Sequence, residues 1–354
     1  MSPEEKNKSE VWARLRKLCE VVKGKRKVLI ITHNNPDPDS VASAWALKYL
    51  FQHYCKVSSV IVYGGIVGRG ENRAMIKHLR IEVKPLKEIN LRNFSTIALV
   101  DTQPGAGNNP LPRSIKANIV IDHHPMRSGS RDADFADVRP DYGSTSSILA
   151  EYCIEFCKTA GKELDKKLAT ALFYGIKSDT RDLGRETSEE DIKSVTTLYP
   201  LLLIRILSRI EHPQVSREYV RAIDRAFKES EIYRDALITD IGSLSNPDMI
   251  AEMADSLLKV EGIEWVLCLG RFNGGLFFSI RTNKRKGNAG RVAIAMARGR
   301  GGSAGGHDMI AGGRFEGERL TESENEELIS RIKERFLKSI NRQGITPVSI
   351  MEEE

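Results

Sequence analysis

The sequence predicts a two-domain α/β protein with a helical connection between the domains. Short apolar runs alternate with amphipathic helical segments from residue 27 to residue 199, which is typical of a mainly parallel sheet flanked by helices. A charged helical stretch follows, and a second, smaller α/β pattern begins at residue 232. We therefore expect a first domain over residues 1–200, a helical linker over 201–231, a second domain over 232–345 and a disordered tail over 346–354.

The first domain is predicted to open on a helix followed by a buried strand. Apolar side chains recur with helical spacing over residues 11–22, and residues 27–32 form a short continuous apolar run. Ser40 is placed to cap a helix that continues to about Gln52. By the same criteria we expect strands at 56–63, 95–101 and 117–122, and helices at 70–79, 144–160, 165–178 and 188–199.

The second half of the chain has its own pattern. Residues 200–230 are helical in spacing and charged on one face, as expected for a connection between domains. The second domain is predicted to hold strands at 232–242, 263–272 and 275–282, a helix at 288–298, a glycine-rich loop and a last helix at 322–340.

The composition fits a globular protein with an anionic partner. Of the 354 residues, 40% are hydrophobic and 29% are charged, and the formal net charge is +6. The positive charge is concentrated, because the stretch from Trp265 to His307 has eight Lys or Arg residues and no Asp or Glu. A basic run is often no more than a solvated face, but the glycines around this one favour a role in binding.

The cysteines and the N-terminus bear on location. The five cysteines are scattered and form no Cys-x-x-Cys pair, so we expect a reduced, cytoplasmic location and ordinary packing rather than disulfides or zinc. The first residues lack signal-peptide character, and the most apolar run is too short to span a bilayer, so no membrane segment is expected. The cysteines are Cys19, Cys55, Cys153, Cys157 and Cys268.

Polar clusters follow several of the predicted strands and one predicted helix. In an open α/β sheet, ligands bind in the crevice beyond the carboxyl ends of the strands. We therefore expect the histidines and carboxylates that follow these strands to lie close together in one site. The residues concerned are His33, Asp37, Asp39, Asp101, Asp122, His123, His124 and Asp179.

Each of these positions has a simpler explanation on its own, because an Asp at such a place is often a helix cap or turn residue. Together they form a cluster in which two carboxylates about 4 Å apart repel by roughly 4 kcal/mol at an effective dielectric near 20. The cluster must protonate, separate or hold cations. Histidine beside carboxylates suits Mn²⁺, Fe²⁺, Co²⁺ or Zn²⁺ better than Mg²⁺. Two metals about 3.5–4 Å apart form a template for in-line phosphoryl displacement.

The motifs resemble those of the DHH family of phosphoesterases, named for a triplet present here as Asp122-His123-His124. The first family motif, His-x-Asn-Pro-Asp-x-Asp-x-x-Gly-Ser, is matched by residues 33–43, with Ala42 where glycine is usual. The triplet is the third motif, and the other two lie on either side of it.

The second motif of the family matches Asp101, and the fourth, an Asp-Thr-Gly stretch, matches Asp179 and Thr180. Arg181 stands in place of the family glycine. A glycine-rich signature of the domain that accompanies one DHH subgroup matches residues 304–313. Four motifs in order, followed by this signature, make the resemblance specific over about residues 25–340.

The resemblance implies a role for each matched residue. His33 and Asp37 bind one metal ion, Asp39, His123 and Asp179 bind the other, and Asp101 bridges both. The implied cofactors are two divalent ions, with Mn²⁺ the first choice. His124 is implied to contact the phosphate and stabilise charge in the transition state, while Asp122 orients a ligand from behind.

The same resemblance assigns substrate binding to the second domain. Arg281 is implied to hold a substrate phosphate, which a guanidinium can do with two parallel hydrogen bonds. His307 is implied to contact the phosphate or base, and the backbone amides of Gly305 and Gly306 approach the substrate closely. For Arg298 and Arg300, phosphate contact and simple solvation remain equal alternatives. A substrate cleft between the two domains is expected.

The resulting prediction is a two-metal phosphodiesterase for very short RNAs or dinucleotides, with removal of the 3′-phosphate of pAp as a second activity, as in the nano-RNase/pAp-phosphatase group. A cyclic di-AMP phosphodiesterase, a RecJ-like single-strand exonuclease and a non-catalytic nucleotide-binding or RNA-binding module remain alternatives. Family II pyrophosphatases share the N-terminal motifs but not the glycine-rich signature. The expected partners are short RNA oligonucleotides or dinucleotides and pAp, with no membrane and with a homodimer left open.

Overall fold

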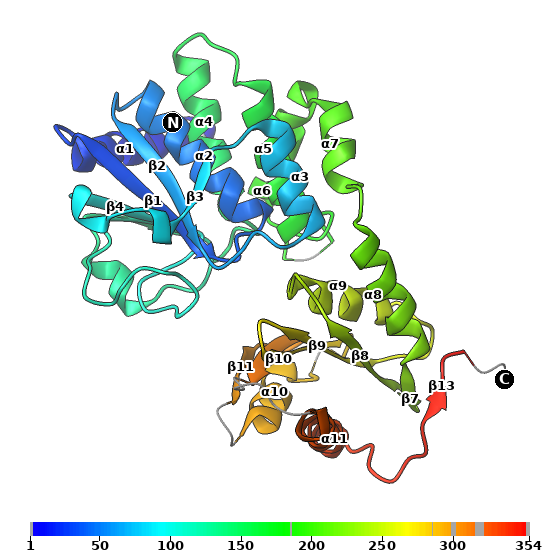
Figure 1. Cartoon of the computed structure of the whole chain (residues 1–354). Helices are drawn as coiled ribbons and strands as arrows, with labels where there is room; N and C mark the ends of the chain where they lie inside the picture. The colour runs from blue at the N-terminus through cyan, green and yellow to red at the C-terminus, as the bar shows by residue number, and fades with distance from the viewer. Residues whose placement is uncertain (1–2, 185, 285, 299–301, 316–321, 352–354) are drawn as a thin grey trace. The chain divides into compact units, whose positions relative to one another are not determined.

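The computed structural model describes residues 3–184, 186–284, 286–298, 302–315 and 322–351, and the chain divides into two compact units (Figure 1). The first unit is Met1–Pro213 and the second is Gln214–Glu354. The division falls inside the segment that the sequence predicts to be a linker. Both units are α/β, and the predicted fold class is confirmed.

The first unit is built on a six-stranded, all-parallel sheet with the order β3-β2-β1-β4-β5-β6. The chain builds outward from β1 to one side and then returns to its other side with β4. The carboxyl ends of β1 and β4 therefore flank a topological switch point, which is where such sheets bind ligands. The strands are β1 (Lys27–Asn34), β2 (Ser58–Gly64), β3 (Val83–Pro85), β4 (Thr96–Val100), β5 (Ile119–Asp122) and β6 (Phe135–Val138).

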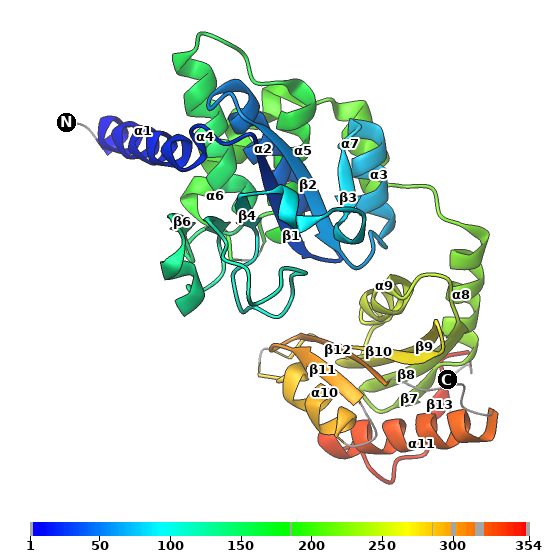
Figure 2. The ribbon, with the colours of Figure 1, turned by 60° about the vertical axis from the view of Figure 1, so that its left-hand side comes forward.

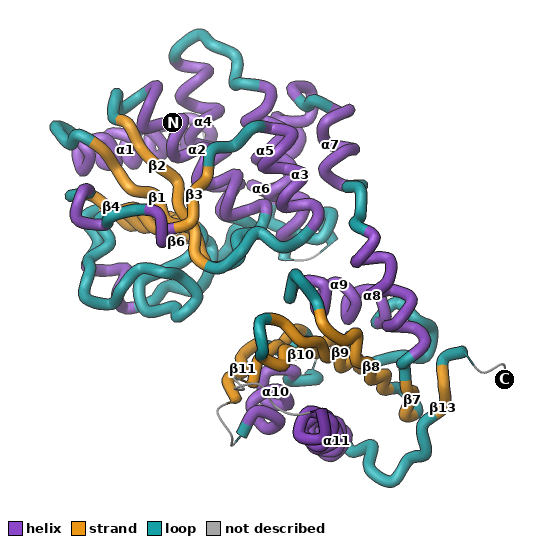
Figure 3. Tube along the Cα trace, in the orientation of Figure 1, coloured by secondary structure: helices purple, strands orange, loops and turns teal. Residues whose placement is uncertain are grey.

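Helices pack on one face of this sheet, where they bury the larger of the two apolar cores of the unit. The other face is covered by loops and short 3₁₀ turns, drawn in teal and purple in Figure 3. Strand residues alternate between the two cores, as the pleat requires. The helices of the main core are α1 (Pro3–Val22), α2 (Pro38–His53), α3 (Gly70–Leu79), α4 (Thr145–Thr159), α5 (Lys166–Asp179), α6 (Glu189–Leu198) and α7 (Ile204–Glu211).

The start of α2 differs from its prediction. Asp37, and not Ser40, caps the helix: its side chain accepts the N–H of Ser40 at 2.9 Å, and Pro38 occupies the first helical position. Proline fits there because its missing N–H has no partner in a first turn. A capping carboxylate therefore stands at the end of the loop that follows β1.

Two strands of the first unit, β3 and β6, were not predicted, because they are 3 and 4 residues long and Lys84 and Asp137 interrupt their apolar residues. The cysteine prediction was wrong at one point: Cys19 of α1 and Cys55 after α2 form a disulfide, with their Cα atoms 5.2 Å apart. Their separation of 36 residues hides the pair in the sequence. Cys153, Cys157 and Cys268 are free and buried, as expected for packing residues.

The charged stretch between the domains forms two helices that belong to different units. Leu207 and Ile210 of α7 are buried in the first unit, and α7 packs against α3. Ala222 and Ala226 of α8 (Arg217–Lys228) are buried in the second unit against β8. In the parts of the chain that the structure describes, no helix has the length and apolarity needed to cross a membrane.

The second unit contains a seven-stranded mixed sheet with the order β11-β12-β10-β9-β8-β7-β13. Figure 2 shows α8 and α9 on one face and α10 and α11 on the other. Among the described strands of this unit, β8 and β9 pair in parallel and the other pairs are antiparallel. The elements are β7 (Glu231–Tyr233), β8 (Ala236–Ser243), α9 (Asp248–Leu257), β9 (Trp265–Phe272), β10 (Gly275–Thr282), α10 (Ala289–Ala297), β11 (Gly302–Gly306), β12 (Ile310–Phe315), α11 (Glu322–Ser339) and β13 (Val348–Ser349).

Three predictions for this unit need correction. The strand expected at 232–242 is the hairpin β7–β8, which turns at Arg234, where φ is +63°. The glycine-rich loop is the hairpin β11–β12. Residues 348–349, expected to be disordered, form β13 and pair with β7. Without β13, β7 would be an edge strand with unpaired backbone N–H and C=O groups. Helix α9 was not predicted.

Glycine is required in the β11–β12 hairpin by close backbone contacts. Gly306 has a φ of +151°, and a Cβ atom there would lie 2.4 Å from the carbonyl oxygen of Ile310. A Cβ atom on Gly290 of α10 would lie 2.5 Å from the carbonyl oxygen of Gly306. The glycines therefore let the hairpin lie directly on α10.

Candidate metal centre

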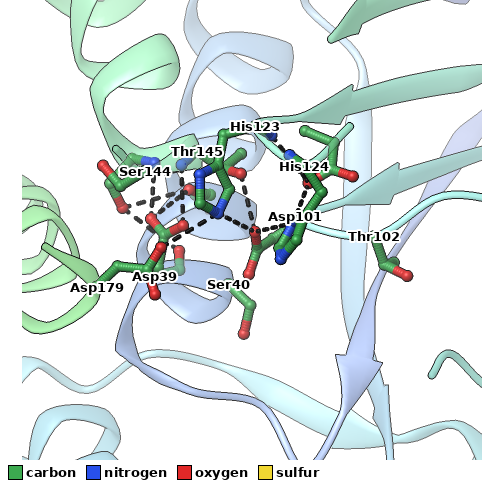
Figure 4. A network of polar contacts seen from close by, with 12 residues as sticks. Asp39, Ser40, Asp101, Thr102, His123, His124, Ser144, Thr145 and Asp179 are labelled. Carbon is green, nitrogen blue, oxygen red and sulfur yellow. Dashed lines mark hydrogen bonds and ion pairs between the residues drawn. The ribbon is translucent and has the colours of Figure 1, made fainter. Parts of the chain in front are cut away.

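The predicted carboxylates and histidines converge at the carboxyl ends of β1, β4 and β5 (Figure 4). His33 lies near the end of β1, Asp101 directly follows β4, and Asp122 ends β5. Helices complete the cluster: Asp37 and Asp39 begin α2, and Asp179 is the last residue of α5. The cluster thus occupies the switch point of the sheet.

Asp101 lies at the centre of this cluster and is only 3% exposed. Its two carboxylate oxygens face different histidines: Oδ2 is 3.4 Å from Nε2 of His33, and Oδ1 is 3.7 Å from Nε2 of His123. Its backbone is left-handed, with a φ of +58°. Asp tolerates this conformation better than most residues, and the sharp turn after β4 directs the carboxylate into the crevice.

The first group of ligand atoms comes from His33, Asp37 and Asp101, whose nearest atoms all lie within 4.8 Å of one another. Nε2 of His33 is 3.4 Å from Oδ1 of Asp37. Nδ1 of His33 lies 2.9 Å from the carbonyl oxygen of Asn34, which favours the tautomer that leaves Nε2 free for a metal. Asp37 therefore caps α2 and faces the cluster at the same time.

The second group comes from Asp39, His123 and Asp179, also within 4.8 Å. Nε2 of His123 is 3.1 Å from Oδ2 of Asp179, and its Nδ1 lies 3.1 Å from the carbonyl oxygen of Tyr142. Asp39 is completely buried, and its two oxygens accept the backbone N–H groups of Thr145 and Ser146 at 2.9 and 2.7 Å.

The electrostatics of the cluster call for positive charge. Burial, together with the charges of Asp101 and Asp179, raises the pKa of Asp39 well above its ordinary value, and burial likewise raises the pKa of Asp101. Although burial opposes a charged imidazole, the surrounding carboxylates raise the pKa of His33 well above its ordinary value and that of His123 to about 11. Imidazole and carboxylate donors around one buried carboxylate fit a borderline divalent cation.

His124 belongs to a third possible ligand group, with Asp101 and His123, and its Nδ1 lies 3.8 Å from Oδ1 of Asp101. Among the described residues, Asp122 belongs to none of the three groups. Oδ1 of Asp122 lies 2.9 Å from Nδ1 of His124 and accepts the backbone N–H groups of both His123 and His124. This hydrogen bond raises the pKa of His124. The His124 side chain is 55% exposed, whereas Asp122 is buried. Nε2 of His124 is thus presented to solvent by a buried carboxylate.

Several residues that support the cluster were missed at the sequence level. Gln103, 1% exposed, donates to Oδ2 of Asp122 at 2.7 Å and accepts the N–H of Arg127. Thr145 donates its hydroxyl to Oδ1 of Asp101 at 2.9 Å. The run Ser144-Thr145-Ser146-Ser147 was a signal for the helix start, but no sequence signal links Gln103 to Asp122.

The structure explains why glycine is usual at position 181. Arg181 has a φ of +48°, and Asp182 and Leu183 also have left-handed backbones. Glycine adopts this conformation without strain, whereas other residues do so at a cost of about 1–2 kcal/mol each. Arg181 follows Asp179 by two residues and adopts the left-handed backbone that glycine favours.

The second unit places its predicted substrate-binding residues on β10, at the end of α10 and on the β11–β12 hairpin. Gly305, Gly306 and His307 are exposed at the end of that hairpin. Arg281 is only 5% exposed and donates to Asp255, Ser279 and the carbonyl of Ile280. Its neighbours along the predicted basic stretch behave differently: Arg298 is exposed at the end of α10, and Arg300 lies outside the described residues.

Two protein-family domains match this chain, one within each of the two units. The N-terminal domain of the DHH family matches residues 27–176, and the DHHA1 domain matches residues 235–338. An uncharacterized protein of Methanocaldococcus jannaschii is 38% identical over 270 residues, which is 76% of this chain and 54% of that protein.

More distant similarities point the same way. A Streptococcus pyogenes protein described as a probable manganese-dependent inorganic pyrophosphatase is 27% identical over 169 residues, or 46% of this chain and 51% of that protein. The chain thus spans about half the length of these curated relatives. The crystal structure of an exopolyphosphatase-related protein from Bacteroides fragilis has a TM-score of 0.70 at 13% identity, covering 93% of this chain and 98% of that chain. At this identity it supports the fold alone.

The fold and the site define a class of protein: two α/β units, the first with a buried carboxylate–histidine cluster at the switch point of a parallel sheet. The two domain matches cover both units, and the chain belongs to the DHH family, as its motifs predicted.

Proposed function

We propose that the protein is a metal-dependent phosphoesterase that hydrolyses phosphodiester bonds of very short RNAs or dinucleotides and also removes the 3′-phosphate of pAp. The observation that carries this proposal is the position of Asp101. Its two oxygens face the two separate ligand groups, so one carboxylate is placed to bridge two cations. A buried acid surrounded by further carboxylates and histidines has no evident structural purpose without cations.

In this proposal His33 and Asp37 hold one divalent ion, Asp39, His123 and Asp179 hold the other, and Asp101 holds both. Mn²⁺ suits the mixed imidazole and carboxylate donors, and the similar Streptococcus protein is described as manganese-dependent. When bound, two such ions supply an activated water and neutralise charge on the phosphoryl oxygens.

His124 and Asp122 have a different role in the same reaction. The exposed ring of His124 is positioned to donate a hydrogen bond to a phosphate oxygen at the mouth of the cluster. Asp122 holds Nδ1 of that ring, and their hydrogen bond raises the pKa of His124 and so favours the charged imidazole. A charged donor at this place stabilises the negative charge that grows in the transition state.

The second unit is proposed to bind the nucleotide part of the substrate. The edge strand β11 exposes Gly305 and Gly306, and a Cβ atom on Gly305 would meet no other atom within 4 Å. A base or phosphate has room to approach this backbone closely. His307 is exposed beside them, whereas Arg281 is buried on β10 with its guanidinium ion-paired to Asp255, so its predicted contact with a substrate phosphate would require this pair to open.

A panel of substrates tests the proposal. We expect EDTA to abolish hydrolysis and Mn²⁺ to restore it, with the highest kcat/KM for pApA and a short RNA, and lower values for a long RNA, cyclic di-AMP and pyrophosphate. Full activity in EDTA would exclude the metal mechanism. A preference for pyrophosphate would move the protein to the function described for its Streptococcus relative, and equal inactivity on every substrate would favour a binding module.

Salt dependence separates short substrates from long ones. Each phosphate that the protein contacts lowers log affinity by about 0.7 for a tenfold rise in salt, using the single-strand value. We expect a shallow slope from one or two contacts, and a raised KM without loss of Mn²⁺ in His307→Ala. A slope several times steeper, with tighter binding to the long RNA, would indicate an exonuclease that tracks a strand.

A further inference from the structure

We propose that Thr145 is a positioning residue that holds the carboxylates of Asp39 and Asp101 in a fixed relation to each other, and thereby sets the affinity of the centre for its cations. This inference rests on the proposed function, in which Asp39 belongs to one ion and Asp101 to both. Nothing in the motifs of the sequence assigns Thr145 a role.

Thr145 contacts both carboxylates from a single residue (Figure 4). Its backbone N–H donates to Oδ2 of Asp39 at 2.9 Å, and its hydroxyl donates to Oδ1 of Asp101 at 2.9 Å. It is the first residue of α4 and is completely buried. One buried residue therefore ties the start of α2 to the end of β4.

The hydroxyl is the important group in this arrangement. An ionised carboxylate only accepts hydrogen bonds, so the single hydroxyl proton of Thr145 must point to Asp101. The other groups near Oδ1 of Asp101 are Nε2 of His123 at 3.7 Å and Nδ1 of His124 at 3.8 Å, which are too long for hydrogen bonds. The Thr145 hydroxyl is therefore the hydrogen-bond donor that fixes Oδ1 of Asp101, while Oδ2 faces Nε2 of His33 at 3.4 Å.

The position of Thr145 is itself well determined. Ser144 caps α4 through the N–H of Ser147 at 3.2 Å, and Ser146 donates its N–H to Oδ1 of Asp39 at 2.7 Å. Completely buried Asp191 accepts the N–H of Gly143 at 2.8 Å and the hydroxyl of Ser147. The residues on both sides of Thr145 are thus held in place by hydrogen bonds. Metal ligands whose hydrogen-bond partners are fixed in this way bind metals more tightly than ligands without such partners.

Substitutions at position 145 separate the hydroxyl from the backbone contact. Thr145→Val keeps the shape and the N–H and removes only the hydroxyl, Thr145→Ser keeps the hydroxyl, and Thr145→Ala removes both hydroxyl and methyl. Thr170→Val is the matched control, because Thr170 is also a completely buried helical threonine of the first unit, with its hydroxyl bonded to the carbonyl of Lys166. Thr170 has no contact with the metal ligands in the described hydrogen-bond network.

Mn²⁺ binding to the full-length, metal-free proteins is measured by titration calorimetry, together with circular-dichroism melting without metal. We expect Thr145→Val and Thr145→Ala to bind at least one Mn²⁺ about 10–100-fold more weakly, the range found for partners of metal ligands. Thr145→Ser should stay within about threefold of the wild type, since it keeps that partner. Thr170→Val should bind Mn²⁺ as the wild type does, even if it melts earlier. At saturating Mn²⁺, Thr145→Val should lower kcat and leave KM unchanged, because Thr145 is buried away from substrate.

Two outcomes would overturn the inference while leaving the proposed function in place. One is a wild type that takes up two Mn²⁺ and a folded Thr145→Val that binds them equally well. The other is a Thr145→Ser as impaired as Thr145→Val, which would show that packing matters and not the hydroxyl. If Thr145→Val does not fold, the comparison of Thr145→Ala with Thr145→Ser decides. A wild type that binds no Mn²⁺ would overturn the proposed function, and this inference with it.

Discussion

Replacing Asp101 by Asn should make the metal-free protein more stable and the Mn²⁺-loaded protein less stable than the wild type. The reason lies in the sign of the pKa shift. Burial raises the pKa of Asp101 in the folded protein, so its ionised form is less favourable folded than unfolded. A carboxyl with a raised pKa subtracts from stability as the pH rises above its unfolded value. At neutral pH, removing the charge restores that stability.

The structure sets the size of the effect. Carboxylate oxygens of Asp37 and Asp101 lie within 4.8 Å of each other, which corresponds to a repulsion of roughly 3 kcal/mol at an effective dielectric near 20. The protonated imidazoles of His33 at 3.4 Å and His123 at 3.7 Å attract Asp101 by roughly 4–5 kcal/mol each on the same scale, so they offset this repulsion, and burial of the Asp101 charge decides the sign of the pKa shift. We therefore expect a net gain of about 1–2 kcal/mol for Asp101→Asn, at the lower end of the cost of burying a polar group without full compensation. In a domain of this size, that raises the Tm by about 2–8 °C.

Asp101→Ala serves as the control for backbone strain. The φ of +58° at this position suits Asn as well as Asp, whereas alanine is disfavoured there by about 1–2 kcal/mol. The alanine variant should therefore be less stable than the asparagine variant by about that amount, although both remove the same charge.

Mn²⁺ should reverse the order of stability. A ligand at 100 times its Kd stabilises a protein by about 2.7 kcal/mol for one site, and both ions depend on Asp101 in our proposal. The assay is thermal and urea unfolding of wild type and Asp101→Asn, each with EDTA and with saturating Mn²⁺. A metal-free Asp101→Asn that is less stable than the wild type, or an equal rise in Tm with Mn²⁺ for both proteins, would refute this reasoning.

Three further predictions follow from the structure. His124→Ala should retain both Mn²⁺ ions by calorimetry and lose about 10²–10³ in kcat; loss of an ion would make His124 a ligand. Asp137→Asn removes the bidentate carboxylate partner of the buried Arg139 guanidinium and leaves Glu151 as its remaining carboxylate partner, so urea unfolding at pH 7 should show a loss of about 1–3 kcal/mol. Although burial opposes the charge, Arg139 lowers the pKa of Asp137 in the folded protein. The ion pair therefore stabilises the fold above the unfolded pKa of the carboxyl, and the stability difference between Asp137→Asn and the wild type should shrink as the pH falls below about 4. A stability difference that stays constant with pH would contradict this prediction. Replacing Cys19 and Cys55 with Ala removes the disulfide and should lower the unfolding free energy by about 3–4 kcal/mol, as calculated from the length of the loop that the disulfide closes. The kcat should be unchanged. Unfolding curves of the wild type that are the same with and without reductant would argue against this prediction.

The apolar pattern of the sequence predicted the long elements of the first unit. It did not predict the short strands β3 and β6 of that unit or the glycine-rich strands β11 and β12 of the second unit. Strands β1, β4 and β5 are buried on both faces and appear as continuous apolar runs. Strands β3 and β6 are too short to show a period. Five of the eleven residues in strands β11 and β12 are glycine, which has no side chain to alternate, so the two strands were predicted as a loop.

The site shows the same division between sequence and tertiary structure. The sequence alone predicted which histidines and aspartates come together at the site, because these residues recur at strand ends in a motif order that is typical of the DHH family. Only the tertiary structure decided that Asp101 turns through a left-handed backbone to face both histidines, and that Asp37 is a helix cap as well as a member of the cluster.

The supporting residues were decided by tertiary structure alone. Gln103 and Thr145 reach the cluster through hydrogen bonds across 19 and 44 residues of sequence, and Asp191 holds Gly143, two residues before Thr145, across 48 residues. The Cys19–Cys55 disulfide likewise depends on where α1 and the end of α2 come together. Local sequence reflects the preferences of neighbouring residues. A hydrogen bond between distant segments forms only after packing has brought its two atoms within about 3 Å. A disulfide between distant segments likewise forms only after packing has brought the two Cα atoms within about 4.4–6.8 Å.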